Sequence, residues 1–216
     1  MYKRQDETPQ AWRRGVVVIR IGTNDFGAAT SLERLARDPA DNEVQAAIDR
    51  CLADIGEAVA LIRKRHPQTA LVLVGIFDNS HWAKYHDRWQ SPAQLAGIAR
   101  GLDRFDDGLR RLAAADPRAV FFDDRRWFSA HWGSRGADGL PAYGTVDIGG
   151  SWPIGNTAGD HPRNAVLQDG HAGLVWNTLW AGELLRLLNE RFGTAIPPIQ
   201  PAELLDYLGE DVRSAR

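Results

Sequence analysis

The sequence predicts an α/β fold built on a parallel sheet, and three observations carry this prediction. Short apolar runs alternate with long segments in which apolar residues recur every three or four positions. The order along the chain is strand, helix, strand, helix, strand, with the apolar runs at 16–21, 70–76 and 119–122. Crossovers of this kind are right-handed and join parallel strands, so we expect one parallel sheet.

Composition sets the limits of this prediction. The 216 residues are enough for one α/β domain with a full core, and we expect no second domain. The net charge is −2 and the basic residues form no stripe, which argues against a nucleic-acid partner. No apolar run is long enough to span a membrane. Cys51 is the only cysteine, which excludes an internal disulfide, and its place on an apolar helix face predicts a small core residue.

The first strand, at 16–21, is the element around which the rest is organised. It is β-branched apart from Arg20, and Gly15 and Gly22 bound it, which is typical of a strand covered on both faces. The turn at 22–25 reads Gly-Thr-Asn-Asp and follows the carboxyl end of the strand, where open α/β sheets place ligands. Asparagine and aspartate are also ordinary turn residues, so this stretch alone leaves a purely structural role open.

The middle elements follow from periodicity and end signals. A loop or short helix at 25–41 precedes a long helix at 42–65, which Asp41 caps and His66-Pro67 ends. The next helix starts after Ser91 with a capping box and a proline, and Asp116-Pro117 stops it. The two helices share apolar stripes at helical spacing: Val44, Ile48, Cys51, Ile55, Val59 and Ile62 on the first, and Leu95, Ile98, Leu102, Phe105, Leu109 and Leu112 on the second.

The segment at 123–168 is long, irregular and rich in glycine, proline, tryptophan and aspartate. Such a loop is functional or carries small elements of its own, and we expect a short hairpin strand at 145–148. A helix follows Gly173 and runs to about Phe192, with Gly193 as its C-cap. Five tryptophans fall in predicted loops and either line a cleft or fill space beneath the loops: Trp82, Trp89, Trp127, Trp132 and Trp152.

The first five residues, Met-Tyr-Lys-Arg-Gln, resemble the translation of a transposon adapter used in shotgun sequencing. We therefore expect residues 1–5 to be a non-native tail and the natural protein to continue upstream. The alternative is an ordinary short polar tail.

Two motifs together suggest acyl-transfer chemistry. The first is Gly22-x-Asn24-Asp25 after a strand, and the second is Asp169-Gly170-His171 before the last long helix. Ester hydrolysis needs a nucleophile, a general base, a group that orients the base, and oxyanion donors. Histidine is the usual base, a carboxylate orients it, and a rigidly held asparagine amide can donate to the oxyanion.

In these two motifs the chain resembles the SGNH (GDSL-type) hydrolase family of esterases and lipases, over about residues 15–192. Residues 21–25 look like the family's third block, in which the asparagine is an oxyanion donor. Residues 169–171 look like its fifth block, in which aspartate and histidine complete the triad. The resemblance implies a three-layer α/β/α sandwich at 6–195 that lacks its first strands, followed by a C-terminal extension at 196–216 with a short helix at 202–208.

Two departures from the family pattern matter. The Gly-Asp-Ser block with the nucleophile and the second-block glycine are both absent, and we expect them upstream of residue 6. The chain's own serines stand in no nucleophile motif, and we assign none of Ser80, Ser134 and Ser151. The family spacing is Asp-x-x-His, which aligns Gln168 with the aspartate, so Asp160 stays open as an alternative to Asp169.

The resemblance implies a serine ester hydrolase with His171 as base, Asp169 as orienting acid and Asn24 as oxyanion donor, and Gly22 and Asp25 support the turn. No metal or organic cofactor is needed, and the substrate is a small-molecule, lipid or carbohydrate ester. A non-catalytic binding domain that keeps the cleft is the alternative. Loss of the family's first strand would leave 16–21 as an exposed edge, so we expect dimerisation or aggregation through it. A metal cluster of Asp78, His81, His86 and Asp87 matches no known spacing, and a solvated loop is favoured.

Overall fold

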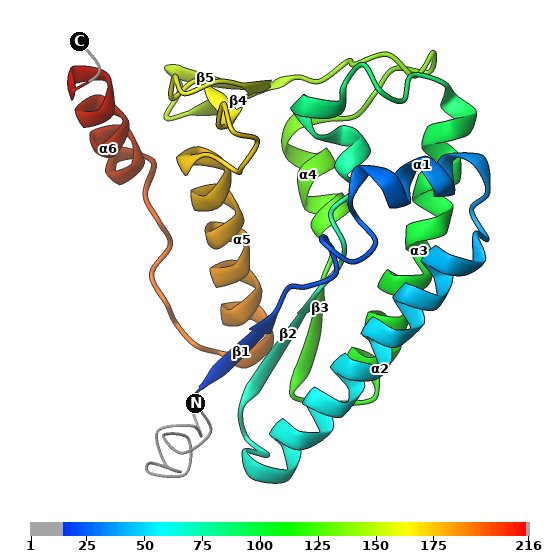
Figure 1. Ribbon diagram of the computed structural model, residues 1–216. Coiled ribbons are helices and arrows are strands. Elements are labelled where there is room, and N and C mark those ends of the chain that lie inside the picture. The colour runs from blue at the N-terminus through cyan, green and yellow to red at the C-terminus, as the bar shows by residue number, and fades with distance from the viewer. Residues whose placement is uncertain (1–14, 215–216) are drawn as a thin grey trace. The chain divides into compact units, whose positions relative to one another are not determined.

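The computed structural model describes residues 15–214 (Figure 1). The tail predicted at residues 1–5 lies outside the described residues. The chain divides into two compact units, and each is described by itself. We call them the sheet unit, Met1–Asp78 with Ala96–Arg125, and the hairpin unit, Asn79–Leu95 with Arg126–Arg216.

The sheet unit contains the predicted parallel sheet. Its strands are β1 (Val16–Ile19), β2 (Ala70–Val74) and β3 (Ala119–Phe122), in the order β1-β2-β3, and both pairs are parallel. Every residue of β2 is buried, as expected for a central strand in a parallel sheet. The prediction of an α/β fold with parallel strands is therefore confirmed.

The first strand differs from its prediction. Coverage on both faces was expected, but β1 is only half-buried and Val18 is 38% exposed. Within residues 15–214, β1 pairs with β2 alone, so one of its edges has no neighbouring strand. An apolar strand at an edge keeps part of its surface in contact with water, which is the reason for the difference.

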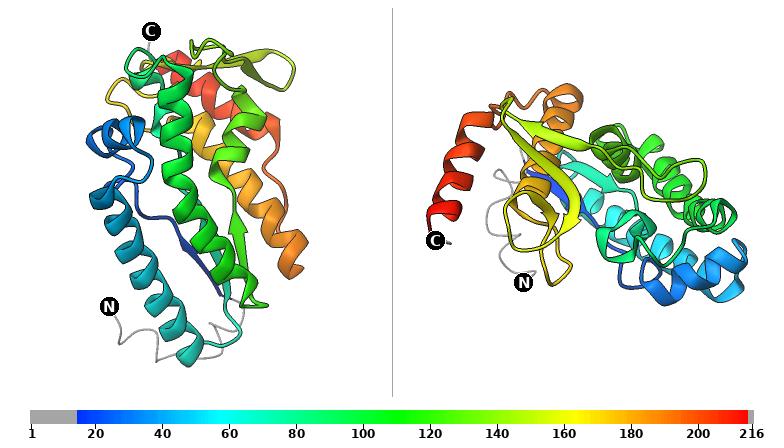
Figure 2. Two further views of the ribbon diagram at one scale, coloured as in Figure 1. Left: turned by 90° about the vertical axis from the view of Figure 1, so that its right-hand side faces the viewer. Right: turned by 90° about the horizontal axis from the view of Figure 1, so that it is seen from above.

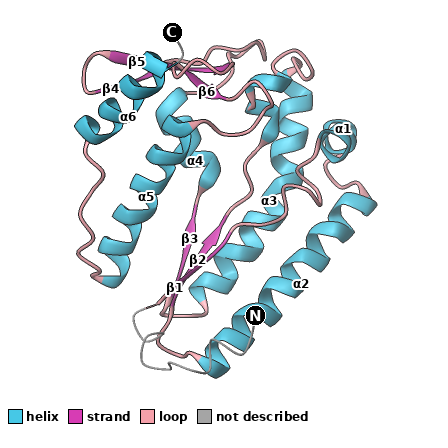
Figure 3. Cartoon of the chain, turned by 60° about the vertical axis from the view of Figure 1, so that its left-hand side comes forward, coloured by secondary structure: helices cyan, strands magenta, loops and turns pink. Residues whose placement is uncertain are grey.

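Three helices belong wholly or mostly to the sheet unit: α1 (Ala29–Arg37), α2 (Asn42–Arg65) and α3 (Pro92–Ala114). The boundaries of α2 match the prediction because local signals set them. The Asp41 carboxylate accepts a hydrogen bond from the backbone N–H of Val44 at 3.0 Å, and the helix ends before His66-Pro67. Helices α2 and α3 run side by side (Figure 3), and Cys51 of α2 is buried as predicted. Burial raises the pKa of this thiol to about 11.

The hairpin unit contains structure where the sequence predicted an irregular loop. It holds most of α4 (Asp124–Trp132) and a second sheet of β4 (Thr145–Ile148), β5 (Trp152–Ala158) and β6 (Asn164–Val166). Strands β4 and β5 are antiparallel, whereas β5 and β6 are parallel. The predicted strand at 145–148 is confirmed, and so is the expectation that the segment carries elements of its own. Two short 3-10 helices, Asn79–His81 and Ala83–Tyr85, precede them along the chain.

Two helices complete the hairpin unit (Figures 1 and 2). Helix α5 (Leu174–Phe192) ends at Gly193, which has a φ of 65° and is the predicted left-handed C-cap. Helix α6 (Pro201–Ser214) is longer than the predicted 202–208. It continues through Gly209 because Leu208, one turn after the buried Leu204, is itself buried and holds the helix in place. None of the helices in the described part of the chain is long and apolar enough to cross a membrane.

The tryptophans form the core of the hairpin unit. Trp89, Trp127 and Trp132 are at most 5% exposed, and the Trp132 ring stacks on Trp176 with centroids 4.8 Å apart. The reading in which these three line a cleft is therefore wrong, and they fill space beneath the surrounding segments. Apolar burial of this size explains how a small sheet and short helices remain compact.

Candidate functional site

The turn after β1 is held by its own backbone and by one aromatic ring. The Gly22 carbonyl accepts hydrogen bonds from the backbone N–H groups of Asp25 and Phe26, both at 3.0 Å. Gly22 has a φ of +106°, and a Cβ there would lie 2.5 Å from the Phe26 ring. Phe26 is fully buried and packs on Phe105 with ring centroids 4.8 Å apart. Glycine is therefore required for the chain to leave the strand at this angle.

This arrangement exposes the polar residues of the turn. Asn24 and Asp25 are both exposed to solvent at the end of β1. No hydrogen bond to another described residue engages the Asn24 amide. The amide donors are therefore available to a ligand, while the backbone that carries them is fixed.

The second motif is a histidine–aspartate pair in a closed loop. His171 Nδ1 lies 3.0 Å from Asp169 Oδ2, and the His171 backbone N–H donates to Asp169 Oδ1 at 2.9 Å. The backbone N–H of His171, and then its side chain, hold the pKa of the Asp169 carboxyl below its ordinary value. Within the described residues the His171 ring bonds to Asp169 alone, so Nε2 is left facing solvent. A neutral imidazole held in this way has a basic Nε2.

Gly170 allows the Asp169 and His171 side chains to meet although only one residue separates them. Its φ of +91° turns the chain so that the two flanking side chains meet, and a Cβ there would lie 3.1 Å from Lys84 Cδ. The loop closes through two backbone bonds: Gly170 N–H donates to the Leu167 carbonyl at 2.9 Å, and Leu167 N–H donates to the His171 carbonyl at 2.8 Å. The structure thus brings Asp169 and His171 together despite the missing residue.

Asp160, the alternative acid, is engaged elsewhere. Its Oδ1 accepts the backbone N–H of Gln168 at 3.1 Å. His161 is also bound locally, through Nδ1 to the backbone N–H of Arg163 at 3.1 Å. The contacts in the hairpin unit therefore favour Asp169 as the partner of His171.

Two residues that the sequence reasoning did not assign contact the His171 loop. Trp82 Nε1 donates to the Gly170 carbonyl at 2.9 Å, and the Trp82 ring packs edge-on against Trp176 at 4.9 Å. Lys84 lies beside Gly170, and its charge also lowers the pKa of Asp169. Trp82 and Gly170 are 88 residues apart in the chain, so no local spacing could have pointed to the contact.

His81 and His86, which had no evident partner in the sequence, belong to a polar cluster in the hairpin unit. His81 Nδ1 lies 3.0 Å from the Tyr143 hydroxyl, and the His86 ring stacks on Tyr143 at 4.9 Å. Asn156, which is 3% exposed, donates to the His81 carbonyl at 2.9 Å. Burial, followed by the charge of Arg135, lowers the pKa of His86. These contacts are structural, and no group of three or more metal-ligating side chains occurs among the residues described.

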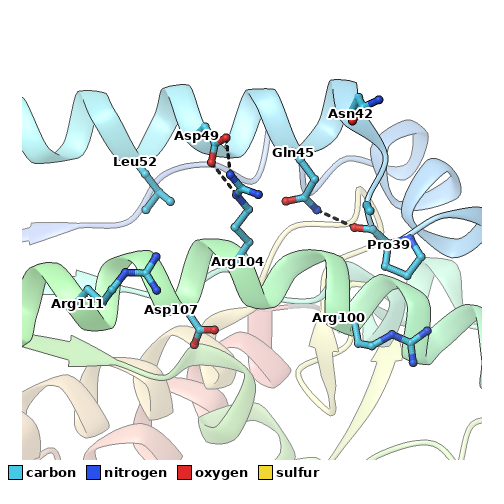
Figure 4. A pocket seen from close by; sticks show the side chains of 10 residues that line it. Pro39, Asn42, Gln45, Asp49, Leu52, Arg100, Arg104, Asp107 and Arg111 are labelled. Atoms are coloured by element: carbon cyan, nitrogen blue, oxygen red, sulfur yellow. Dashed lines mark hydrogen bonds and ion pairs between the residues drawn. The ribbon is translucent and has the colours of Figure 1, made fainter.

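A groove of about 730 Å³ in the sheet unit lies between α2 and α3 (Figure 4). Gly108 of α3 faces Leu52 of α2, and a Cβ on Gly108 would lie 2.5 Å from the Leu52 side chain. Arg104 crosses the groove and forms two hydrogen bonds of 2.7 Å with Asp49 (Figure 4). The residues predicted for the site do not line the groove, and its central charges pair with each other, so we assign it no ligand.

The candidate residues are divided between the two units. Asn24 with its turn belongs to the sheet unit, and the Asp169–His171 pair belongs to the hairpin unit. Comparisons of the chain with protein-family models, with curated proteins and with solved structures each gave no match.

Proposed function

We propose that the protein is a serine ester hydrolase of the SGNH type that acts on carboxylic esters. The observation that carries the proposal is the Nδ1–Oδ2 contact of 3.0 Å between His171 and Asp169, which leaves Nε2 free to act as a base. The corresponding fold is a three-layer α/β/α sandwich at 6–195, and the residues beyond 195 form an extension.

In this mechanism the serine hydroxyl attacks the ester carbonyl and its proton passes to His171 Nε2. Asp169 stabilises the imidazolium that forms, and its lowered pKa keeps it ionised while it does so. The imidazolium then returns the proton to the leaving alcohol, and water hydrolyses the acyl-serine in a second cycle of the same kind. No cofactor enters the reaction.

Asn24 has the role of an oxyanion donor. Its amide stands on a backbone that the Gly22 turn holds in place, so little reorganisation is needed when charge develops on the carbonyl oxygen. Removal of one such donor costs about 2.7–4 kcal/mol of transition-state stabilisation. Asp25 supports the turn and takes no direct part in the reaction.

We place the nucleophilic serine of this mechanism upstream of residue 6, where the family pattern would put it. Residues 1–14 contain no serine, and His171 has no hydrogen bond to a serine within the described chain. The open edge of β1, with Val18 38% exposed, offers a pairing site for the upstream strand that would end in Gly-Asp-Ser. An acyl lipid, a short-chain ester and an O-acetylated sugar are all compatible substrates.

Recovery of the upstream coding sequence tests the proposal. We expect a strand ending in Gly-Asp-Ser, and we expect the extended protein to hydrolyse p-nitrophenyl acetate and to be labelled on that serine by a fluorophosphonate. His171→Ala removes both signals, whereas His161→Ala, a matched loop histidine, retains them. An upstream sequence without a nucleophile block would instead favour the non-catalytic binding domain.

The chain of 216 residues provides a second test. Its turnover of p-nitrophenyl acetate should not exceed that of its own His171→Ala variant. Clear turnover that depends on His171 would show that an internal serine is the nucleophile and would overturn the upstream assignment.

A further inference from the structure

The C-terminal extension forms one side of a hollow in the hairpin unit. The hollow has a volume of about 440 Å³, within the range of about 300–1,000 Å³ that is usual for small-molecule sites. Leu174 and Thr178 of α5 line it, together with Ile199 of the linker and Leu204 and Tyr207 of α6. The linker runs back along α5, so α6 lies near the first turn of that helix (Figure 1).

Exposed apolar side chains gather at this hollow. Of the eight large hydrophobic residues that are exposed in the described chain, three line it: Leu174 at 44%, Ile199 at 38% and Tyr207 at 65%. Leu167, which does not line the hollow, is 37% exposed and donates its backbone N–H to the His171 carbonyl. Contiguous exposed apolar surface marks a site of interaction more often than scattered residues do.

The hollow lies close to the candidate base. Leu174 follows His171 by three residues, so their Cα atoms are at most about 11 Å apart even for an extended chain. The loop between them is short and fixed, since Gly173 N–H donates to the Ala165 carbonyl at 2.8 Å. An ester whose carbonyl lies at His171 can therefore extend its chain into the hollow.

The charged residues at the rim indicate which ligands are excluded. Glu203 and Asp206 are exposed acidic residues among those that line the hollow. Glu203 accepts the backbone N–H of Gln200 at 2.8 Å and so caps α6, whereas Asp206 has no partner among the described residues. Two carboxylates beside an apolar hollow disfavour an anionic group there. The charges at the rim therefore exclude an anionic ligand, and the apolar side chains that line the hollow favour an aliphatic group.

We propose that this hollow is a subsite for the uncharged aliphatic chain of the ester substrate. The assignment of that chain to a substrate rests on the proposed function, whereas the binding of an aliphatic chain does not. The extension at 196–216 is then a specificity element, because α6 and its linker supply most of the lining. Affinity should rise about fourfold for each added methylene until the hollow is filled.

Calorimetric titration of the full chain with alcohols tests the subsite without any need for catalysis. We expect saturable binding of octan-1-ol, weaker binding of hexan-1-ol, and a negative heat-capacity change. Octanoate, measured where it is fully ionised, should bind at least about tenfold more weakly than octan-1-ol. Absence of saturable octan-1-ol binding, or equal affinity for octanoate, overturns the proposal.

Matched variants locate the binding. Ile199→Asp should weaken octan-1-ol binding about tenfold or more, because it places a charge on an apolar wall outside any helix. Leu61→Asp, at a residue 40% exposed on α2, is the control and should change nothing. Tyr207→Ala, whose side chain is 65% exposed, should weaken binding several-fold while the circular dichroism spectrum stays unchanged. Equal binding by the Ile199, Tyr207 and Leu61 variants would overturn the site.

His171→Ala separates this inference from the proposed function. The substitution should leave octan-1-ol affinity unchanged, because the His171 side chain does not line the hollow. If alcohols bind but the upstream-extended protein hydrolyses no ester, the subsite stands and the hydrolase proposal fails. If the upstream-extended protein hydrolyses esters but binds acetate and octanoate esters equally well, the hydrolase proposal stands and the subsite is refuted.

Discussion

His171 Nδ1 lies 3.0 Å from Asp169 Oδ2 across a single residue, Gly170. His171 thus binds both oxygens of the Asp169 carboxylate: its backbone N–H binds Oδ1, and its ring Nδ1 lies against Oδ2. The pair is exposed, with side-chain exposures of 81% for His171 and 65% for Asp169, so its geometry depends on the loop and is not imposed by burial.

The first prediction concerns the pKa of Asp169. An NMR titration should place it below the ordinary value for aspartate, and His171→Ala should keep the larger part of the shift, because the backbone N–H of residue 171 is the leading cause. Since the folded-state pKa is lowered, these bonds stabilise the loop above the ordinary aspartate pKa. That stabilisation is lost as the pH falls through the lowered value. Gly170→Ala, which strains a φ of +91°, should move the pKa back toward the ordinary value. A pKa of Asp169 at or above the ordinary value would contradict the observed geometry.

The second prediction concerns the Gly22 turn. Gly22→Ala should lower the free energy of unfolding by about 2–4 kcal/mol, because it combines a strained positive φ with a clash against the buried Phe26 ring. Gly133→Ala is the matched control: φ is +78° there, but apart from its chain neighbours no described residue has an atom within 4 Å of the added Cβ. The Gly133→Ala substitution should lower the free energy of unfolding by about 1–2 kcal/mol, because it introduces backbone strain without a clash. Urea denaturation measures both, and equal losses would show that the clash contributes nothing.

The third prediction tests the link between Trp82 and the His171 loop. Trp82→Phe removes the hydrogen bond to the Gly170 carbonyl, which contributes about 1 kcal/mol, while an aromatic ring remains against Trp176. Hydrogen exchange at the Gly170 and His171 amides should therefore become faster. Trp127→Phe is the control, because the Trp127 Nε1 has no hydrogen-bond partner among the residues that the structure describes. If both variants change exchange in this loop equally, loss of ring volume and not of the hydrogen bond is the cause.

The fourth prediction concerns the edge of the sheet. We expect the chain to self-associate through β1, whose apolar residues lack a second strand partner within the described residues. Val18→Lys should shift sedimentation velocity profiles toward monomer, because a lysine on an exposed edge opposes strand pairing. Leu61→Lys introduces the same charge on α2 and should have no such effect. A wild-type chain that is monodisperse and monomeric over a concentration series would contradict this prediction.

Much of the fold could be predicted from the sequence, because local interactions determine where several helices and strands begin and end. The ends of α2 follow from the Asp41 cap and from Pro67, and the end of α5 follows from Gly193, since each signal acts within one helical turn. Strand β3 and strand β4 were also predicted at their observed positions, because their apolar or alternating patterns are short and clearly bounded.

Non-local contacts set the rest. The sequence identifies Asn24, Asp169 and His171 as the residues with suitable chemistry, because their types and their positions next to glycines can be read directly. Only the tertiary structure pairs His171 with Asp169 in preference to Asp160, supports Gly170 with the distant Trp82, and leaves Val18 at an open edge. The physical reason is that a side chain's partners and exposure depend on segments brought together by folding, whereas caps and turns depend on neighbours along the chain.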